Sequence, residues 1–434
     1  MSQSTEAITV DDHRLLNKSD ARTLGLSSLG GALEFYDFIV FVFYAKIISE
    51  QFFPKHLDPF WAMLNTWGIF AAGYFFRPLG GIVMAHFGDK LGRKKMFTLS
   101  ILMMSLPTMF IGLLPNFSVI GYAAPLLLLV ARAVQGIAIG GEIPAAWTYV
   151  SEHVPSRHVG MANGALCAGL NIGILIGSLV ALVIEKSFGS EVVADWAWRI
   201  AFVAGGVMGL ITMHMRRVLH ETPIFQQMRA RKQLYKGVPL KAVLTQHGGA
   251  VVLSMLLTWV LTACIMVALL STPQLMSQGF GIPKPTAFAM QSGAILAGTA
   301  GCLVYGVLCD RIGVGNTLLL AAVALVVSSV LYYTNLGAAS IPMLTVWYLL
   351  MGFATGIAAC VPTAMAKSFP APVRLSGIAF SYNVCYAICG AATFPLLTIL
   401  AQYTPIAGMY YLIGLSVLAV LCGLYVRRLT NNTL

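Results

Sequence analysis

The stretch GDKLGRKK, residues 88–95, recurs in a weaker form as GVLCDRIG, residues 306–313. Each copy follows a long apolar segment and holds one aspartate, Asp89 or Asp310, inside a turn bounded by glycines. The two aspartates are separated by about half the length of the chain, and the second copy lacks the basic residues that end the first. Repeats at such a spacing are typical of membrane transport proteins built from two related halves. The two motifs therefore predict a duplicated fold.

The composition places this duplicated fold in a membrane. The chain has 434 residues, of which 58% are hydrophobic and 10% are charged, and its mean hydropathy is +0.80. Soluble domains carry about 25% charged residues, so this chain has too little polar surface for water. Its apolar segments approach or exceed the roughly 20 residues that cross a bilayer as a helix. We place twelve of them at about 23–48, 60–86, 96–114, 118–149, 159–184, 198–215, 248–272, 286–309, 317–335, 341–366, 375–400 and 406–426.

The distribution of Lys and Arg predicts the orientation. These residues gather in the polar N-terminal segment and in alternate loops, and such loops face the cytoplasm. Both termini are therefore expected in the cytoplasm. The longest loop is also the most basic and falls midway along the chain. The expected organisation is all-α, with twelve transmembrane helices in two pseudo-symmetric six-helix bundles: an N-terminal arm (1–22), a first bundle (23–215), a basic linker (216–247), a second bundle (248–428) and a tail (429–434).

The net charge of +11 is explained by these loops and does not require a nucleic-acid partner. The eight cysteines are scattered and form no CxxC pair, so the sequence supports neither a zinc site nor a disulfide framework. No converging nucleophile and base or metal-ligand set indicates an enzyme, and no soluble output domain indicates a sensor. We expect no cofactor other than a coupling proton.

Five ionisable residues lie well inside the expected spans. They are the acids Glu34, Asp37 and Glu142 and the bases Arg77 and Arg132. A charge at the bilayer centre costs about 2.5–3.5 kcal/mol on insertion scales, so such residues persist when they are paired or functional. At a rise of about 1.5 Å per residue, the position of a residue along its span gives its depth in the membrane. These depths predict that Arg132 pairs with Asp37 or Glu34 near mid-membrane, and that Arg77 pairs with Glu142 nearer the cytoplasm.

Static ion pairs that hold helices together are one interpretation of these residues. The other is proton coupling, because three acids and two bases leave one unmatched carboxylate. Burial favours the neutral form of a carboxyl group, and no histidine lies near the centre of a span. We therefore take Asp37 as the favoured proton carrier, with Glu34 as its neighbour and Glu142 as the next candidate.

The candidate substrate-binding residues come from both halves. A mid-membrane guanidinium suits a carboxylate, which it can bind through two hydrogen bonds. The spans of the second half carry no acid or base, but they offer polar and aromatic side chains, Thr262 among them, that can shape a pocket. The candidates are Arg132, Gln135, Arg77, Trp259, Gln291, Tyr382, Asn383 and Tyr386.

Seven stretches resemble the major facilitator superfamily and, within it, the metabolite:proton symporter family. They are GALEFYDF (31–38), FRPLGGIVMAHFGDKLGRKK (76–95), ARAVQGIAIGGE (131–142), SEHVPSRHVG (151–160), WAWRIAF (196–202), HETPIF (220–225) and FPAPVRLSG (369–377). The family includes bacterial carriers of citrate, oxoglutarate, shikimate, proline and betaine. This chain departs from relatives at Phe35 and Tyr36, where they commonly show Trp and Phe.

The resemblance also implies a role for the repeated loop motif. In this superfamily the motif looks like a latch, in which Asp89 lies near a helix N-terminus and pairs with a base. A carboxylate in that position gains about 0.3–1 kcal/mol from the helix dipole, a size that suits a gate that must reopen. The implied gating residues are Gly88, Asp89, Gly92, Arg93, Asp310 and Arg311.

The resulting interpretation is a proton-coupled symporter that imports a small organic solute by alternating access, with a carboxylate favoured. Uptake of a zwitterionic osmolyte such as proline or betaine, and an exporter or passive facilitator on the same fold, remain alternatives. The expected setting is a multi-pass monomer in the lipid bilayer of a bacterial inner membrane.

Overall fold

The computed structural model of the chain describes residues 14, 16–235 and 237–431, and all the regular structure in this part is helical. Twelve helices are long and apolar enough to cross a membrane. The predicted fold class is confirmed. Parts of the expected N-terminal arm and tail, at 1–13, 15 and 432–434, lie outside the described residues.

The first half contains six long helices with two short ones between them. The long helices are α1 (Lys18–Phe52), α2 (Pro59–Leu91), α3 (Arg93–Leu113), α5 (Ala123–Ser151), α6 (Val159–Phe188) and α8 (Trp198–Arg216); the short ones are α4 (Phe117–Ile120) and α7 (Ser190–Val192).

The second half repeats this plan after two linker helices, α9 (Pro223–Ala230) and α10 (Pro239–Gln246). Two of its spans change helix type along their length. The first of these spans is α11 (Gly248–Ile265), continued by η3 (Met266–Ser271), α12 (Thr272–Gln274) and η4 (Leu275–Gly279). The second is α15 (Ile341–Ala354), continued by η5 (Thr355–Ala359) and α16 (Cys360–Ser368). The other four are α13 (Lys284–Arg311), α14 (Val314–Thr334), α17 (Arg374–Ala401) and α18 (Ala407–Asn431).

Local sequence explains where these helices begin and end. The Asn17 side chain caps α1 and exchanges hydrogen bonds with Asp20 in a capping box. Each of the two repeated loop motifs contains a glycine with positive φ, which is +121° at Gly92 and +85° at Gly313. Only glycine adopts such angles without steric cost, so each motif makes an abrupt turn between two consecutive spans.

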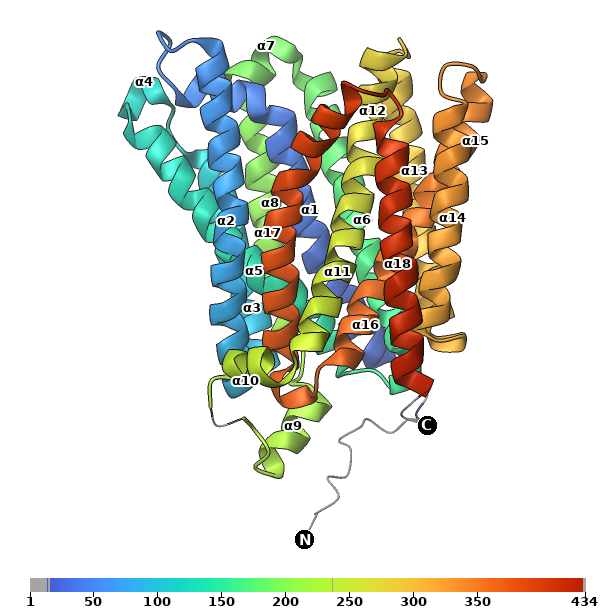
Figure 1. Cartoon of the computed structure of the whole chain (residues 1–434). Helices are drawn as coiled ribbons and strands as arrows, with labels where there is room; N and C mark the ends of the chain where they lie inside the picture. The colour runs from blue at the N-terminus through green and yellow to red at the C-terminus, as the bar shows by residue number, and fades with distance from the viewer. Residues whose placement is uncertain (1–13, 15, 236, 432–434) are drawn as a thin grey trace.

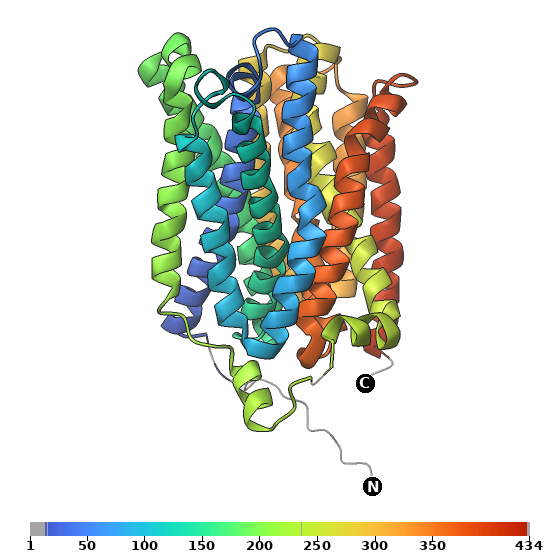
Figure 2. The same ribbon diagram turned by 90° about the vertical axis from the view of Figure 1, so that its left-hand side faces the viewer.

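The helices pack into two groups that meet along the middle of the molecule. Within the groups, α2 packs on α5, α1 on α6, and α14 on α18. Between the groups, the most extensive contacts join α6 to α13 and α2 to α17. Figures 1 and 2 show the long helices standing side by side, with α4 and α7 at one end and α9, α10, the start of α1 and the end of α18 at the other. We call the end with α9 and α10 the terminal end and the end with α4 and α7 the far end.

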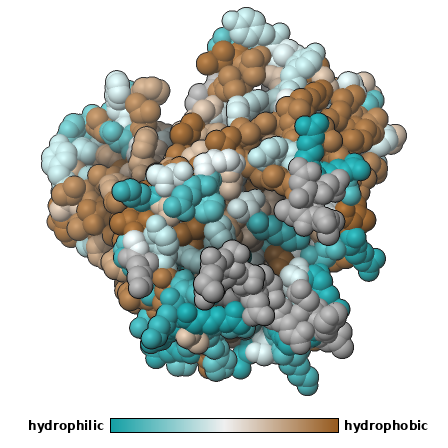
Figure 3. Space-filling view, turned by 60° about the horizontal axis from the view of Figure 1, so that its bottom comes forward, coloured by the Kyte–Doolittle hydropathy of each residue, from teal (hydrophilic) through white to brown (hydrophobic). Residues whose placement is uncertain are grey.

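The surface of the molecule agrees with a membrane setting. The flanks expose large apolar side chains, such as Phe75 at 76% and Val323 at 58%. Figure 3 views the terminal end, where hydrophilic residues gather while hydrophobic ones dominate the flanks. Exposed apolar surface on this scale is favourable only in lipid.

Close packing of α2 on α5 sets the framework of the central site. A Cβ atom added to Gly136 would collide with the backbone of Gly73, and one added to Gly140 would collide with the carbonyl oxygen of Arg77. Small residues at such crossings let two helix backbones approach closely. The contact places Arg77 of α2 and Arg132 of α5 in the wall of one cavity.

Candidate functional site

Asp37 and Arg132 form a buried ion pair in which the carboxylate has several hydrogen-bond donors. The Arg132 Nη1 atom lies 3.0 Å from Oδ2 of Asp37. Asp37 also accepts hydrogen bonds from Thr108 Oγ1 at 2.9 Å and from Gln135 Nε2 at 3.0 and 3.1 Å. Arg132 donates to Oε1 of Gln135 at 2.8 Å. The prediction that Arg132 pairs with Asp37 or Glu34 is thus confirmed for Asp37, and Gln135 orients this pair.

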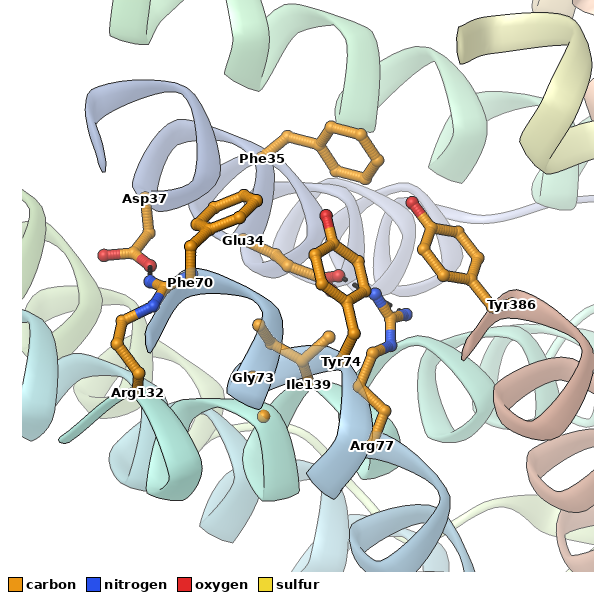
Figure 4. A pocket seen from close by; sticks show the side chains of 11 residues that line it. Glu34, Phe35, Asp37, Phe70, Gly73, Tyr74, Arg77, Arg132, Ile139 and Tyr386 are labelled. Atoms are coloured by element: carbon orange, nitrogen blue, oxygen red, sulfur yellow. Dashed lines mark hydrogen bonds and ion pairs between the residues drawn. The ribbon is translucent and has the colours of Figure 1, made fainter. Parts of the chain in front are cut away.

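Glu34 and Arg77 form a second and looser pair, 3.8 Å apart. Arg77 also donates to the Tyr382 hydroxyl and to Oδ1 of Asn383, both at 3.4 Å. The second carboxylate oxygen of Glu34, Oε2, is buried and accepts no hydrogen bond from the described residues. Figure 4 shows Asp37 facing Arg132 and Glu34 facing Arg77 across the same cavity.

Three tyrosine rings surround the Arg77 guanidinium. Its Cζ atom lies 4.1 Å from the ring centroid of Tyr386, 5.4 Å from that of Tyr382 and 6.0 Å from that of Tyr74. A cation within about 6 Å of an aromatic face is attracted by the ring quadrupole. Arg77 belongs to α2 and two of the rings to α17, so this cation bridges the two halves.

The predicted pairing of Arg77 with Glu142 is wrong. Glu142 pairs with Arg216 at 2.7 Å and accepts a hydrogen bond from Ser100. Arg216, expected at the start of the linker, is instead the last residue of α8 and is fully buried. Its guanidinium fits against α1 because Gly30 has no Cβ, which would collide with it. The position of Glu142 along its span gives its depth in the membrane, but it does not show that Arg216 lies beside it.

Arg216 also corrects the count of buried charges. Three acids, Glu34, Asp37 and Glu142, now face three bases, Arg77, Arg132 and Arg216. These acids and bases are equal in number, so a coupling proton can be assigned only from the geometry of each pair.

Two cavities adjoin the charged residues. The first has about 440 Å³ of empty space and is lined by both central ion pairs together with Phe70, Tyr74 and Tyr386. The second has about 640 Å³ and lies between the halves, among α5, α6, η5, α11 and α17. Phe35 and Tyr386 line both cavities, so the two cavities adjoin at these side chains.

The other predicted substrate residues divide into two groups. Tyr382 lines the second cavity, and Asn383 donates to the Gly140 carbonyl at 2.7 Å across the interface between the halves. Trp259 and Gln291 line neither cavity. The Trp259 indole donates to Tyr411 at 3.1 Å, and the Gln291 amide donates to the Leu269 carbonyl at 2.9 Å.

At the terminal end the first loop motif contacts the second half directly. Asp89 accepts hydrogen bonds from the Ser376 backbone at 3.0 Å and hydroxyl at 2.6 Å, at the start of α17. Arg93 lies 2.7 Å from Asp89 and 3.3 Å from Glu152 and donates to the Ala371 carbonyl at 2.8 Å. These charges join the halves at the N-terminus of a helix, where an anion is favoured.

The second motif makes a matching but simpler contact. Asp310 accepts hydrogen bonds from the backbone of Gly160 and Met161, both at 2.7 Å, at the start of α6. Arg311 is exposed and is not brought into this contact. The glycines of the first motif provide room, since a Cβ on Gly88 would meet Leu375.

Glycine at position 92 leaves space for Glu221 from the segment before α9. The Glu221 carboxylate accepts hydrogen bonds from the backbone of Arg93 at 3.0 Å and of Lys94 at 3.2 Å, at the N-terminus of α3.

His153 follows α5 and lies outside the spans. Burial lowers the pKa of His153, which favours its neutral form at neutral pH.

The sequence interpretation overlooked several residues of these sites. Tyr74 could have been found, because it lies three residues before Arg77 and so shares its helix face. Thr108 and Glu152 gave no such signal. Thr108 is one of many hydroxyls inside apolar spans and acquires its role only when α3 meets α1 and α5. Glu152 follows a span directly and acquires its role only when the end of α5 meets α3 and α17.

Comparisons with known proteins agree with this architecture. The family model of the Major Facilitator Superfamily matches residues 28–393. The chain is 30% identical to the inner membrane metabolite transport protein YhjE of Escherichia coli (strain K12), covering 96% of this chain and 97% of that protein. It is 30% identical to the shikimate transporter of the same strain, covering 96% and 95%, and 29% identical to the proline/betaine transporter of Salmonella typhimurium, covering 98% and 87%.

Solved structures show the same fold at low sequence identity. The xylose transporter XylE bound to a bromodeoxyglucose superposes with a TM-score of 0.78 at 15% identity, covering 94% of this chain and 95% of that one. The human organic anion transporter MFSD10 gives a TM-score of 0.68 at 14% identity, covering 94% and 99%. The chain belongs to the Major Facilitator Superfamily, and it is a multi-pass membrane transporter rather than an enzyme.

Proposed function

We propose that this transporter is a symporter that imports a small organic carboxylate together with a proton. The observation that carries the proposal is the position of Arg77. Its guanidinium lies 3.8 Å from Glu34 in the first half and 3.4 Å from polar atoms of Tyr382 and Asn383 in the second. All three polar contacts are long, so a substrate carboxylate can replace them.

The geometry favours Glu34, rather than Asp37, as the proton carrier. Asp37 receives hydrogen bonds from Arg132, Gln135 and Thr108, which stabilise its ionised form. Glu34 has one distant base and a buried oxygen without a donor among the described residues. A carboxyl group so poorly solvated gains more from binding a proton.

Proton and substrate are then coupled through Arg77. Ionised Glu34 attracts the guanidinium and competes with the substrate for it. Protonation of Glu34 removes this competition, and Arg77 binds the substrate carboxylate while its tyrosine neighbours from α17 hold it at the interface. Release of the proton on the other side restores the ion pair and expels the substrate. A buried charge therefore always keeps a partner, as a low dielectric requires.

Alternating access is provided by the contacts at the terminal end, which we assign to the cytoplasmic side because basic loops gather there. Asp89 and Asp310 each cap the first turn of a helix in the opposite half. With these contacts made, the terminal end is held closed. Their rupture allows the halves to rock apart there around the central site.

A zwitterionic osmolyte is the second candidate substrate. The three tyrosines around Arg77 form a set of aromatic faces of the kind that binds ammonium groups. Relatives include a protein described as a proline/betaine transporter. In this alternative the substrate carboxylate binds Arg77, and its cationic group lies against the rings.

The test uses purified protein in liposomes with an imposed pH gradient. A panel of radiolabelled organic acids and betaines is screened for accumulation, which identifies the substrate and separates symport from export or passive facilitation. We expect Glu34→Gln, which resembles the protonated form, to exchange labelled for unlabelled substrate but to lose accumulation driven by the gradient. The exposed Glu191→Gln at the far end is the matched control and should behave as wild type.

Two results would redirect the proposal. If Glu34→Gln still concentrates substrate and Asp37→Asn does not, the proton carrier is Asp37. If wild-type protein equilibrates substrates without responding to the pH gradient, the protein is a facilitator and proton coupling is wrong.

A further inference from the structure

The second cavity differs in chemistry from the charged one beside it. It is lined mainly by apolar side chains, and no charged side chain is among its walls. Its polar lining consists of Asn171, Thr262 and Thr355, with the Tyr382 and Tyr386 rings at the border with the charged cavity. The two cavities together have one charged end and one apolar end with a few hydrogen-bonding groups.

The Thr262 hydroxyl is unusual among the buried hydroxyls of this protein. Most hydroxyls in its spans donate to the carbonyl one turn earlier, as Thr258 does to Ser254 at 2.8 Å and Thr363 to Ala359 at 3.1 Å. The Thr262 side chain is 2% exposed, and its Oγ1 has no hydrogen-bond partner among the described residues. Of the buried hydroxyls without a partner, Thr262 is the one that lines either cavity.

An unpaired buried hydroxyl is unfavourable, so its presence in a cavity wall points to a ligand that completes it. Asn171 adds a second group on the same cavity. Its amide makes one weak contact within the described chain, from Nδ2 to the Cys302 sulfur at 3.9 Å. Asn171 belongs to α6 of the first half and Thr262 to α11 of the second, so a ligand held by both contacts the two halves at once.

We infer that the substrate spans both cavities, with its carboxylate at Arg77 and an uncharged hydroxyl or carbonyl group at its other end bound by Thr262 and Asn171. This inference rests on the proposed function and narrows the substrate class. A second carboxylate at that end would be buried in the second cavity without a base, which is costly. The site therefore selects monocarboxylates with a compact apolar body and a distal neutral polar group, and it rejects dicarboxylates.

Three matched acids test this class by isothermal titration of the purified full-length protein in detergent. Benzoate has one carboxylate, para-hydroxybenzoate adds a distal hydroxyl, and terephthalate adds a distal carboxylate. We expect para-hydroxybenzoate to bind about threefold to tenfold more tightly than benzoate, the factor that one neutral hydrogen bond contributes. Terephthalate should bind more weakly than benzoate.

Variants then assign the effect to the residue. Thr262→Val keeps the shape of the side chain and should abolish the preference for para-hydroxybenzoate while benzoate affinity is retained. Thr262→Ser should preserve the preference. Thr258→Val, one turn away with its hydroxyl already bonded and outside the cavity, is the matched control and should also preserve it.

The inference is overturned if Thr262→Val and Asn171→Leu both keep the preference, if terephthalate binds as tightly as para-hydroxybenzoate, or if none of the three acids binds. The titrations need no proton gradient. Failure of the proposed symport is therefore recognised separately, by the liposome assay.

Discussion

The two central arginines differ in how firmly the protein holds them. Arg132 is fixed by Asp37 and Gln135 at 3.0 and 2.8 Å, and its guanidinium lies 4.6 Å from the Phe41 ring. The polar contacts of Arg77 are all 3.4 Å or longer. The first arginine is built into the first half, whereas the second can exchange partners, which is what coupling requires.

We expect Arg77→Lys to weaken substrate binding by about tenfold or more, although the charge is kept, because an ammonium cannot form the two parallel hydrogen bonds of a guanidinium. Binding should be measured by titration with whichever substrate the liposome screen identifies. The exposed Arg311→Lys is the control. Unchanged affinity in Arg77→Lys would show that the carboxylate binds elsewhere, with Arg132→Lys the next variant to measure.

Glu142 and Arg216 make a different kind of pair, fully buried and away from both cavities. We expect Glu142→Gln to destabilise the protein by about 3–5 kcal/mol, because it leaves the buried Arg216 charge without its partner. Thermal unfolding in detergent should detect this change. The folded fraction should still accumulate substrate under a pH gradient, and loss of that coupling would make Glu142 a proton carrier after all.

At the scale of elements, the crossing of α2 and α5 determines the distance between the two arginines. Gly73 faces Gly136 there, and the carbonyl of Arg77 faces Gly140. Neither Gly136 nor Gly140 has space for a Cβ atom, so the two helix backbones approach closely at this crossing. The sites on these helices therefore depend on positions that carry no functional side chain.

We expect Gly140→Ala to lower the melting temperature and to weaken substrate binding, because the added Cβ must push α5 away from α2. Overpacking of this kind costs about 1–3 kcal/mol. Gly68→Ala is the matched control, since Gly68 lies in the partner helix α2 with no atom within 4 Å of the added Cβ. There alanine should stabilise the helix slightly. Equal effects of the two substitutions would contradict a close-packing role for Gly140.

At the scale of the whole molecule, the contacts between the halves are of two kinds. Near the centre, Arg77 and Asn383 join α2, α5 and α17 beside the cavities. At the terminal end, Asp89 and Asp310 each bind backbone N–H groups across the interface. Each terminal contact is modest in energy, so the closed arrangement can be released during a cycle.

We expect Asp89→Asn to shift the protein toward states open at the terminal end, because the amide keeps the size but loses the negative charge that binds Ser376 and Arg93. A cysteine at position 379, one turn into α17 from Ser376, reports this opening by maleimide labelling in a variant without native cysteines. Labelling from the terminal side should increase. Asp195→Asn at the far end should not change it, and equal labelling of both variants would contradict a latch.

The amino-acid sequence by itself determined the large-scale features of this protein. Twelve apolar segments, a repeated loop motif and the placement of Lys and Arg were enough to predict two six-helix halves, because lipid requires each span to be an apolar helix. Sequence also singled out Glu34, Asp37, Arg77 and Arg132 as charges inside apolar spans, since such charges are rare and costly.

Only the tertiary structure decided which of these charges are partners. Position along a span gives the depth of a residue, whereas its neighbours depend on how each helix is rotated and which helices adjoin it. Arg77 was therefore assigned to Glu142 but contacts Glu34, and Arg216 was placed in a loop although it lies buried beside α1. The unpaired hydroxyl of Thr262 is likewise visible only once the helices are packed, because Thr258, one turn earlier in the same helix, satisfies the local pattern that Thr262 does not.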